Sequence, residues 1–152
     1  GGPGAEDWLR ATITSPMEIT RRIIPDGRDS VATTLRGLCD EGCDLILITG
    51  GTGPAPRDQT PEAMADVMEK ELPGFGEEMR RASLREVPTA ILSRQSAGIR
   101  DKTLMITIPG KPSAIATCLD AVFAAVPYCL DLIGAARIET DPARIRAFRP
   151  KT

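Results

Sequence analysis

The sequence predicts an α/β fold, a three-layer α/β/α sandwich built around a mostly parallel sheet. Short apolar runs alternate along the 152 residues with longer segments in which apolar side chains recur at helical spacing. The run Leu45–Ile48 lacks polar alternation, which is typical of a parallel strand covered on both faces. The length fits one domain, which we place at residues 1–140, followed by an irregular tail over residues 141–152.

The first forty residues are expected to form a helix, an edge strand and a second helix. Residues 6–13 carry apolar side chains at helical spacing. Residues 17–23 alternate apolar with polar side chains, which predicts a half-covered strand near a sheet edge. A helical pattern then runs from Asp29 to a stop at Gly42. Together with the run at 45–48, these segments predict a βαβ unit.

The middle of the chain predicts two helices. The first begins at Thr60, which is placed to act as its N-cap, with Pro61 at the first helical position. Residues 64–72 continue this helix with an apolar stripe, and residues 76–85 form a second, shorter helix.

The remaining elements are two extended segments and a long helix. Residues 87–92 are extended and apolar, and the polar run at 93–98 is either a second site loop or a surface turn. Residues 103–108 alternate as a strand does. A long amphipathic helix over 115–133 follows, in which Pro127 predicts a kink or a split.

Bulk properties exclude several classes of function. A net charge of −2 and an aromatic content of 3% argue against nucleic-acid binding. No apolar run approaches the ~18 residues of a membrane span, so we expect a cytoplasmic protein without membrane contact. The absence of histidine excludes Ser-His and Cys-His nucleophile pairs. The four cysteines are expected to be small core residues.

Three strand ends carry residues suited to a binding site. Asp26 follows the segment 17–23, a glycine loop over residues 50–53 follows the second strand, and residues 109–113 follow the last. Parallel neighbouring strands would place all three segments at one edge of the sheet, where ligands bind in open α/β folds.

The glycine loop does not match the familiar phosphate motifs. A dinucleotide fingerprint would need a small residue at Pro56, and a Walker loop would need glycine at Met105 and a hydroxyl at Pro112. Glycines nevertheless let the backbone approach a ligand, and the helix that follows presents an N-terminus that attracts anions. A purely structural turn is the alternative for this loop.

Asp26 and Asp58 point to a metal when they are taken together. Each alone suits a turn or a cap. As a pair opposite a phosphate-binding loop, they suit Mg²⁺, which takes one or two carboxylates together with waters and substrate phosphates. Metal-assisted nucleotide transfer needs no histidine, because it relies on positioning and charge neutralisation.

Four ordered blocks resemble the molybdopterin adenylyltransferase family of molybdenum cofactor biosynthesis; they read GGTGPAPRDQTPE, PGFGEEMR, PTAILSRQSAG and IPGKPSAI. The resemblance covers residues 8–140, and a sister group of similar domains shares much of the pattern. It implies that ATP and molybdopterin give adenylyl-molybdopterin and pyrophosphate with Mg²⁺, in a homotrimer that contacts the molybdenum-insertion enzyme. The alternative is a catalytically idle pterin-binding or assembly module of the same fold.

The resemblance also implies roles for individual residues. Asp26 and Asp58 match the two acidic positions tied to catalysis and to the metal. The positions that match the family's substrate and nucleotide cleft are Gly50, Gly51, Thr52, Gly53, Ser93, Arg94, Pro109, Gly110, Lys111, Pro112 and Ser113. The family usually has a small polar residue at the position of Lys111, which leaves the role of this lysine open.

One departure concerns the start of the chain. Family members begin with an apolar strand that precedes the segment GGP, with which this sequence opens. We therefore expect the fold to lack that first strand. Three explanations are open: the chain is a fragment, another chain completes the fold, or the start of the chain was not recorded.

Overall fold

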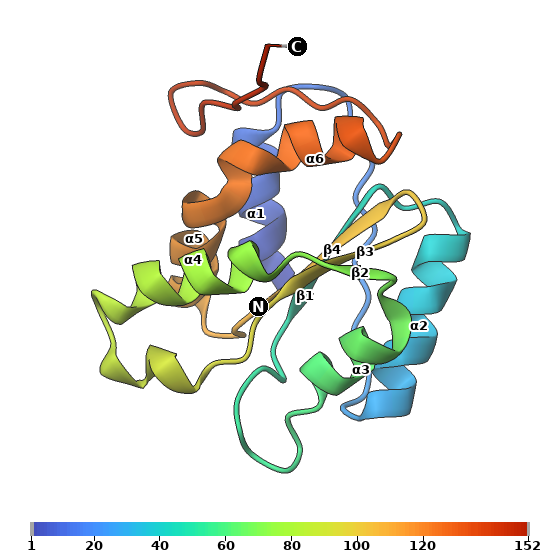
Figure 1. Cartoon of the computed structure of the whole chain (residues 1–152), viewed down its shortest axis with the longest axis vertical. Helices are drawn as coiled ribbons and strands as arrows, with labels where there is room; N and C mark the ends of the chain where they lie inside the picture. The colour runs from blue at the N-terminus through green and yellow to red at the C-terminus, as the bar shows by residue number, and fades with distance from the viewer. Residues whose placement is uncertain (1, 152) are drawn as a thin grey trace.

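The computed structural model describes residues 2–151 and contains a four-stranded sheet in the order β1-β4-β3-β2, with helices on both faces (Figure 1). The strands are β1 (Leu45–Thr49), β2 (Lys70–Glu71), β3 (Ala97–Arg100) and β4 (Thr103–Ile108). The α-helices are α1 (Gly2–Thr12), α2 (Arg28–Asp40), α3 (Thr60–Val67), α4 (Pro73–Leu84), α5 (Pro112–Val122) and α6 (Val126–Leu132). Two short 3₁₀ helices complete the set, η1 (Pro88–Leu92) and η2 (Phe123–Ala125).

Two apolar cores confirm the three-layer α/β/α arrangement. Helices α1, α4, α5 and α6 cover one face of the sheet, and α2 with α3 covers the other. Strand β4 serves both cores, because Leu104 and Ile106 face the larger core while Met105 faces the smaller one. All six residues of β4 are buried, whereas only Ile46 is fully buried in β1. Strand β4 is therefore the most buried strand. The run at 45–48 is covered on both faces, as predicted, because Leu45 and Leu47 pack against the larger core and Ile46 and Ile48 against the smaller one, although three of these four residues stay partly exposed.

The sheet is mixed in direction. Strand β1 pairs in parallel with β4, in the register Leu45↔Leu104 to Thr49↔Ile108. Strand β3 runs antiparallel to both β4 and β2, so three of the four strands point the same way. Strand β3 was not predicted. It is joined to β4 by a tight turn at Asp101, whose φ is 50°, and a turn of this length can only connect antiparallel strands.

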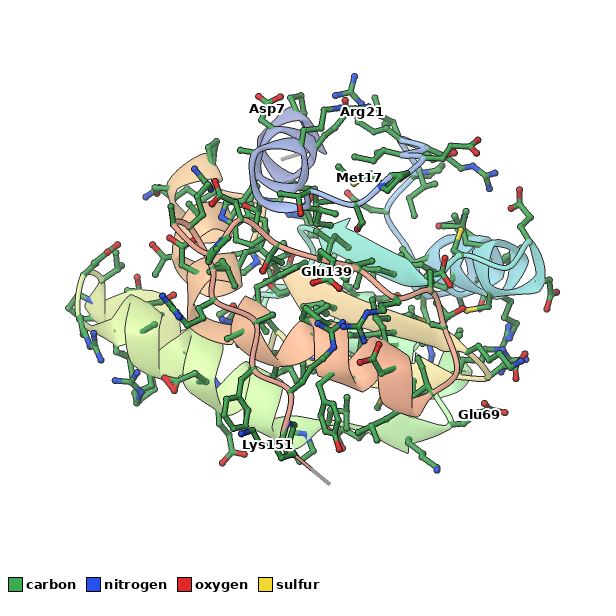
Figure 2. The ribbon with its side chains drawn as sticks, turned by 90° about the horizontal axis from the view of Figure 1, so that it is seen from above. Asp7, Met17, Arg21, Glu69, Glu139 and Lys151 are labelled. Carbon is green, nitrogen blue, oxygen red and sulfur yellow. The ribbon has the colours of Figure 1, made fainter. Side chains whose placement is uncertain are left out.

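Several predicted elements differ in the structure. Residues 17–23 form no strand within the described chain, and this segment runs between α1 and α2, with Met17 and Arg21 labelled in Figure 2. Helix α3 ends at Val67 because Met68 is extended, with φ −70° and ψ 142°, so the predicted stripe to residue 72 was too long. The stretch 87–92 is mostly the 3₁₀ helix η1, which Pro88 opens.

Other predictions are confirmed. The first helix is α1, although it begins earlier than residue 6. The long C-terminal helix is split by η2 just before Pro127. Gly42 and Gly134 end their helices with positive φ values of 86° and 76°. Beyond the bridge between Ile13 and Thr140, residues 141–151 form turns and irregular chain, yet Ile145 is buried in the larger core.

One stretch of the described chain, Pro112–Leu132, is long and apolar enough by composition to cross a membrane. This finding corrects the expectation that no apolar run reaches that length. The stretch comprises α5, η2 and α6, and its side chains Leu119, Phe123 and Leu130 are buried in the larger core. Packing against the sheet therefore accounts for its apolar character.

Candidate active site

The glycine loop and the loop over residues 109–113 lie side by side at the carboxyl ends of β1 and β4. The amide of Gly50 donates to the carbonyl of Ile108 at 2.9 Å, which extends the β1/β4 pairing by one residue. A Cβ on Gly110 would lie 3.4 Å from the Cα of Gly50. The prediction that these two segments share one edge of the sheet is confirmed, because β1 and β4 are parallel neighbours.

The glycine loop needs its glycines. Gly50 and Gly51 have φ values of 94° and 69°, a backbone conformation that favours glycine. A Cβ on Gly51 would also collide with the hydroxyl of Thr60. The loop therefore turns back sharply from β1 and lies against the start of α3.

Thr60 fastens the glycine loop to α3. Its hydroxyl donates to the carbonyl of Gly50 at 3.0 Å, and its amide donates to the carbonyl of Gly51 at 3.1 Å. The N-cap position of α3 is Gln59, so the predicted capping role of Thr60 was wrong. Thr60 is buried because both of its polar groups face the loop.

Arg94 holds the other side of the glycine loop. Its side chain donates to the carbonyl of Gly53 at 3.0 Å and to that of Asp58 at 2.8 Å, and it forms an ion pair with Glu62 at 2.6 Å. The guanidinium lowers the pKa of the Glu62 carboxyl, and Glu62 in turn raises the pKa of Arg94. Sequence reasoning missed Glu62, whose only signal was an acidic residue in the first turn of a helix.

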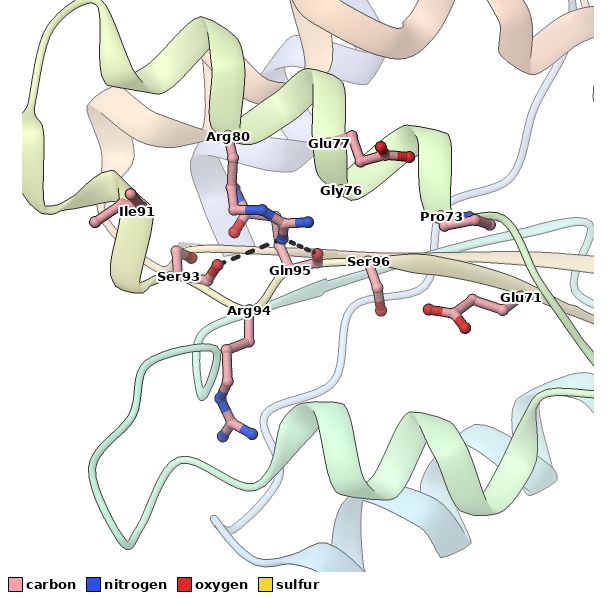
Figure 3. Close-up of a pocket in the computed structure, with 10 residues that line it drawn as sticks. All are labelled: Glu71, Pro73, Gly76, Glu77, Arg80, Ile91, Ser93, Arg94, Gln95 and Ser96. Atoms are coloured by element: carbon pink, nitrogen blue, oxygen red, sulfur yellow. Dashed lines mark hydrogen bonds between the residues drawn. The ribbon is translucent and has the colours of Figure 1, made fainter.

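Ser93 links the segment 93–96 to the same loop. Its hydroxyl lies 3.3 Å from that of Thr52, and the amide of Arg94 donates to the carbonyl of Thr52 at 2.7 Å. The polar run is therefore not a surface turn, because it packs against the glycine loop and leads into β3, and its role as a second site loop stays a prediction. Figure 3 shows Arg94 pointing toward the glycine loop, while Arg80 reaches from α4 toward the segment 93–96.

Two cavities flank the segment 93–96. The first, of about 360 Å³, lies beneath α4 and carries charged side chains on its walls, among them Glu71, Arg80 and Arg94 (Figure 3). The second, of about 210 Å³, lies between the end of α4, η1 and the start of α5. Pro109, Lys111 and Ser113 line the second cavity, so the segment 109–113 contributes directly to it, whereas neither cavity is lined by a residue of the glycine loop.

The loops that carry Asp58 and Asp26 are joined to each other. The carboxylate of Asp58 accepts from the amide of Ala55 at 3.1 Å. Asp26 is exposed in the turn before α2, where Ser30 donates to nearby carbonyls. The amide of Arg28 donates to the side chain of Gln59 at 3.0 Å, which ties the turn before α2 to the loop after β1.

The two aspartates offer oxygen ligands of the kind that Mg²⁺ prefers. Neither carboxylate forms an ion pair with any residue of the described chain, and Asp58 uses one oxygen for the amide of Ala55. The described residues contain no group of three or more His, Cys, Asp or Glu side chains that could hold a metal ion. That Asp26 and Asp58 bind a metal together therefore stays a prediction, and such a cation would also need ligands from bound substrate or water, as Mg²⁺ commonly does.

Comparisons with known proteins agree with the geometry. Residues 5–128 match the model of a probable molybdopterin binding domain. A molybdopterin adenylyltransferase of Helicobacter pylori is 53% identical over 99% of this chain and 86% of its own length. One from Escherichia coli K12 is 46% identical over 100% of this chain and 85% of its own length.

Solved structures show the same fold. The molybdopterin biosynthesis Mog protein from Mycobacterium ulcerans superimposes with a TM-score of 0.81 at 34% identity, over 88% of this chain and 85% of that one. The molybdopterin biosynthesis enzyme MoaB from Thermus thermophilus gives 0.78 at 40% identity, over 90% and 86%.

Proposed function

The chain belongs to the molybdopterin adenylyltransferase family, and we propose from this premise that it transfers the adenylyl group of ATP to molybdopterin. The observation that carries the proposal is the identity of 46–53% with enzymes of that name over almost the whole chain. An idle binding module of the same fold would need neither ATP nor the two aspartates, and no feature of the site favours it.

The reaction is a displacement at the α-phosphorus of ATP. An oxygen of molybdopterin forms the new bond to phosphorus, and the bond from phosphorus to the departing pyrophosphate breaks. No histidine is present to act as a base, so the site works by positioning and by neutralising charge. Mg²⁺, when bound, would neutralise phosphate charge and help to align the reacting oxygens.

The protein's own residues supply the positioning. Gly50, Gly51 and Gly53 are partly exposed and are the proposed phosphate-binding backbone, although the amide of Gly50 bonds Ile108, and Thr52 adds a hydroxyl that is held close to Ser93. Asp26 and Asp58 are the proposed metal ligands and catalytic groups. Lys111 and Ser113 line the neighbouring cavity, from which they can reach a second substrate, and Pro109, Gly110 and Pro112 shape its loop.

The family also supports proposals about context. We place the protein in the cytoplasm, as a homotrimer that contacts the molybdenum-insertion enzyme. Exposed apolar side chains are compatible with contacts between chains, since Ile23, Ile91 and Phe148 are 96%, 69% and 69% exposed.

The test is molybdopterin-dependent release of pyrophosphate from ATP. The unaltered protein is expected to release pyrophosphate only when molybdopterin is present, whereas an idle module would release none. Asp58→Asn is expected to lower the rate by roughly 10²–10³-fold, as loss of one preorganised electrostatic group does, while pterin binding persists. Asp120→Asn is the matched control, because this carboxylate bonds Trp8 at the far end of α5. An undiminished rate in Asp58→Asn would remove Asp58 from the mechanism.

A further inference from the structure

Gln95 is a buried amide with an unpaired polar atom. Its side chain is 1% exposed, and its Oε1 has no hydrogen-bond partner among the residues that the structure describes. Its Nε2 has only a contact of 4.0 Å with the sulfur of Cys118. Rotating the amide by 180° would exchange the two atoms and leave a nitrogen unpaired instead. Buried polar atoms are rarely left unpaired, so this one calls for an explanation.

The backbone around Gln95 is held firmly. Arg80 donates to the carbonyl of Gln95 at 2.8 Å and to that of Ser93 at 3.4 Å, as the dashed lines in Figure 3 show. A Cβ on Gly76 would lie 2.5 Å from the carbonyl of Gln95, so α4 approaches this segment as closely as glycine permits. The backbone that carries the Gln95 side chain is therefore fixed in place.

Gln95 lines both cavities of the site. The cavity beneath α4 is walled by charged groups, including Arg80, Arg94 and Glu77, which suits a charged ligand. The cavity between α4 and α5 has a different character. Its charged residues, Glu86 and Lys111, are exposed, while Ala90, Ala114 and Pro109 form apolar walls. Gln95 adds a buried polar side chain to this lining, and Ser83 and Thr117 add half-buried hydroxyls.

Apolar walls with a few fixed polar groups are typical of a pocket for a flat organic ring. A side-chain amide presents a donor beside an acceptor, and it pairs with a ring edge that presents the same two functions in reverse order. The adenine of ATP has such an edge, and so does the lactam of a pterin. Both substrates of the proposed reaction therefore have a ring edge with which the amide of Gln95 can form two hydrogen bonds.

We propose that Gln95 is a substrate-binding residue whose amide recognises the heterocyclic ring of a substrate in the cavity between α4 and α5. This inference rests on the proposed function and names the ring-binding part of that site. The buried amide has an unpaired atom when no ring is bound. A ring that lacks the matching edge would leave this atom unpaired and would therefore bind more weakly than a ring that has the edge.

The experiment compares Gln95→Leu with the unaltered protein in two measurements, the melting temperature and the KM. If Gln95 had only a structural role, both quantities would change together. Leucine has a similar volume and removes the unpaired atom, so the melting temperature is expected to stay the same or rise. The KM for the substrate whose ring is read is expected to rise by about 10- to 100-fold, the range given by one bidentate pair. Met79→Leu, a change in the apolar core on α4, is the control and should leave both quantities near those of the unaltered protein.

Two arms identify the ring. The first compares ATP with purine riboside triphosphate, which lacks the 6-amino group. If adenine is read, the unaltered protein prefers ATP and Gln95→Leu loses that preference. The second arm titrates molybdopterin at saturating ATP. If the amide of Gln95 binds the pterin, the KM for molybdopterin rises in Gln95→Leu and the preference for ATP is unchanged. Gln95→Met replaces the leucine variant if the latter fails to fold.

Binding measurements separate failure of this inference from failure of the proposed function. Calorimetry with AMP and with 6-hydroxymethylpterin measures ring recognition without any turnover. If the unaltered protein releases no pyrophosphate but Gln95→Leu weakens one of these ligands, the function is wrong and the ring site stands. If Gln95→Leu keeps its melting temperature and binds both ligands with unchanged affinity, the role of Gln95 is overturned.

Discussion

Arg94, in the segment that leads into β3, forms a two-point ion pair with Glu62 in the first turn of α3, with N–O distances of 2.6 Å and 3.2 Å. The same guanidinium also bonds the carbonyls of Gly53 and Asp58. One side chain thus joins the segment before β3 to three points of the continuous stretch from Gly53 to Glu62, which lies 32–41 residues earlier in the sequence. Arg94 is therefore placed to fix the shape of this loop, in addition to lining the cavity beneath α4.

The ion pair is expected to matter more for activity than for stability. Both side chains are 38% exposed, so Glu62→Gln should lower the free energy of unfolding by no more than about 1 kcal/mol. The glycine loop would lose one of its supports, so we expect the KM for ATP to rise while the melting temperature changes little. Steady-state kinetics and thermal unfolding measure the two effects. Glu6→Gln, which breaks the pair with Arg10 on α1, is the control, and equal kinetic effects of both variants would contradict the idea.

Thr60→Val is expected to destabilise the protein and to disorder the glycine loop. The substitution keeps the shape of the side chain but removes the hydroxyl that bonds the carbonyl of Gly50. Leaving this part-buried acceptor unpaired costs at most about 1–3 kcal/mol, the range for a buried group. Chemical unfolding measures this loss, and Thr60→Ser, which restores the hydroxyl, should recover most of it. If serine and valine destabilise equally, the lost methyl packing rather than the hydrogen bond is responsible.

Gly51→Ala is expected to be more harmful than Gly50→Ala. Both positions have positive φ, so alanine is strained at either one by about 1–2 kcal/mol. Only at Gly51 does the added Cβ also collide with Thr60, because nothing lies within 4 Å of a Cβ at Gly50. Unfolding free energies measure the difference. Gly37→Ala, in the interior of α2 with open space around it, should instead stabilise the protein by about 0.5–1 kcal/mol.

Acid should weaken the attachment of the C-terminal segment to α6. Arg149 donates to the carboxylate of Asp131 at 2.6 Å and lowers the pKa of that carboxyl in the folded protein. Because the folded pKa lies below the unfolded value of about 3.9, the stabilisation is complete well above that value and is lost as the pH falls through the folded pKa. The difference in unfolding free energy between the unaltered protein and Asp131→Asn should therefore be constant near neutrality and shrink below about pH 4. A difference that persists unchanged far below that pH would contradict this account.

Patterns within single elements were the most reliable part of the sequence prediction. The helical spacing of the apolar residues over 6–13, the strand at 103–108 and the split before Pro127 are local properties, because they depend on the conformation of a few adjacent residues. The alternation over 17–23 failed as a prediction of a strand, because alternation describes a half-buried extended chain and does not supply a partner for its hydrogen bonds.

The candidate site, like the fold, was only partly predictable from the sequence. The glycines of residues 50–53 and the loop at 109–113 stand out in the sequence, because left-handed backbone and helix starts restrict which residues are allowed. Their adjacency became certain only with the parallel pairing of β1 and β4. Glu62 bonds Arg94, which is 32 residues away in the sequence, and Thr60 bonds Gly50, which is 10 residues away. A local sequence pattern cannot predict contacts at such separations.

The fold class, the family resemblance and the loops proposed for the site could thus be inferred from the amino-acid sequence, since short-range geometry and ordered motifs depend on residues that are close together in the chain. Three properties could be learned only from the folded structure: Arg94 holds the glycine loop, β3 runs antiparallel, and Oε1 of Gln95 is buried without a partner among the described residues. These properties arise from contacts between distant segments, and a hydrogen bond depends on where both of its partners come to rest.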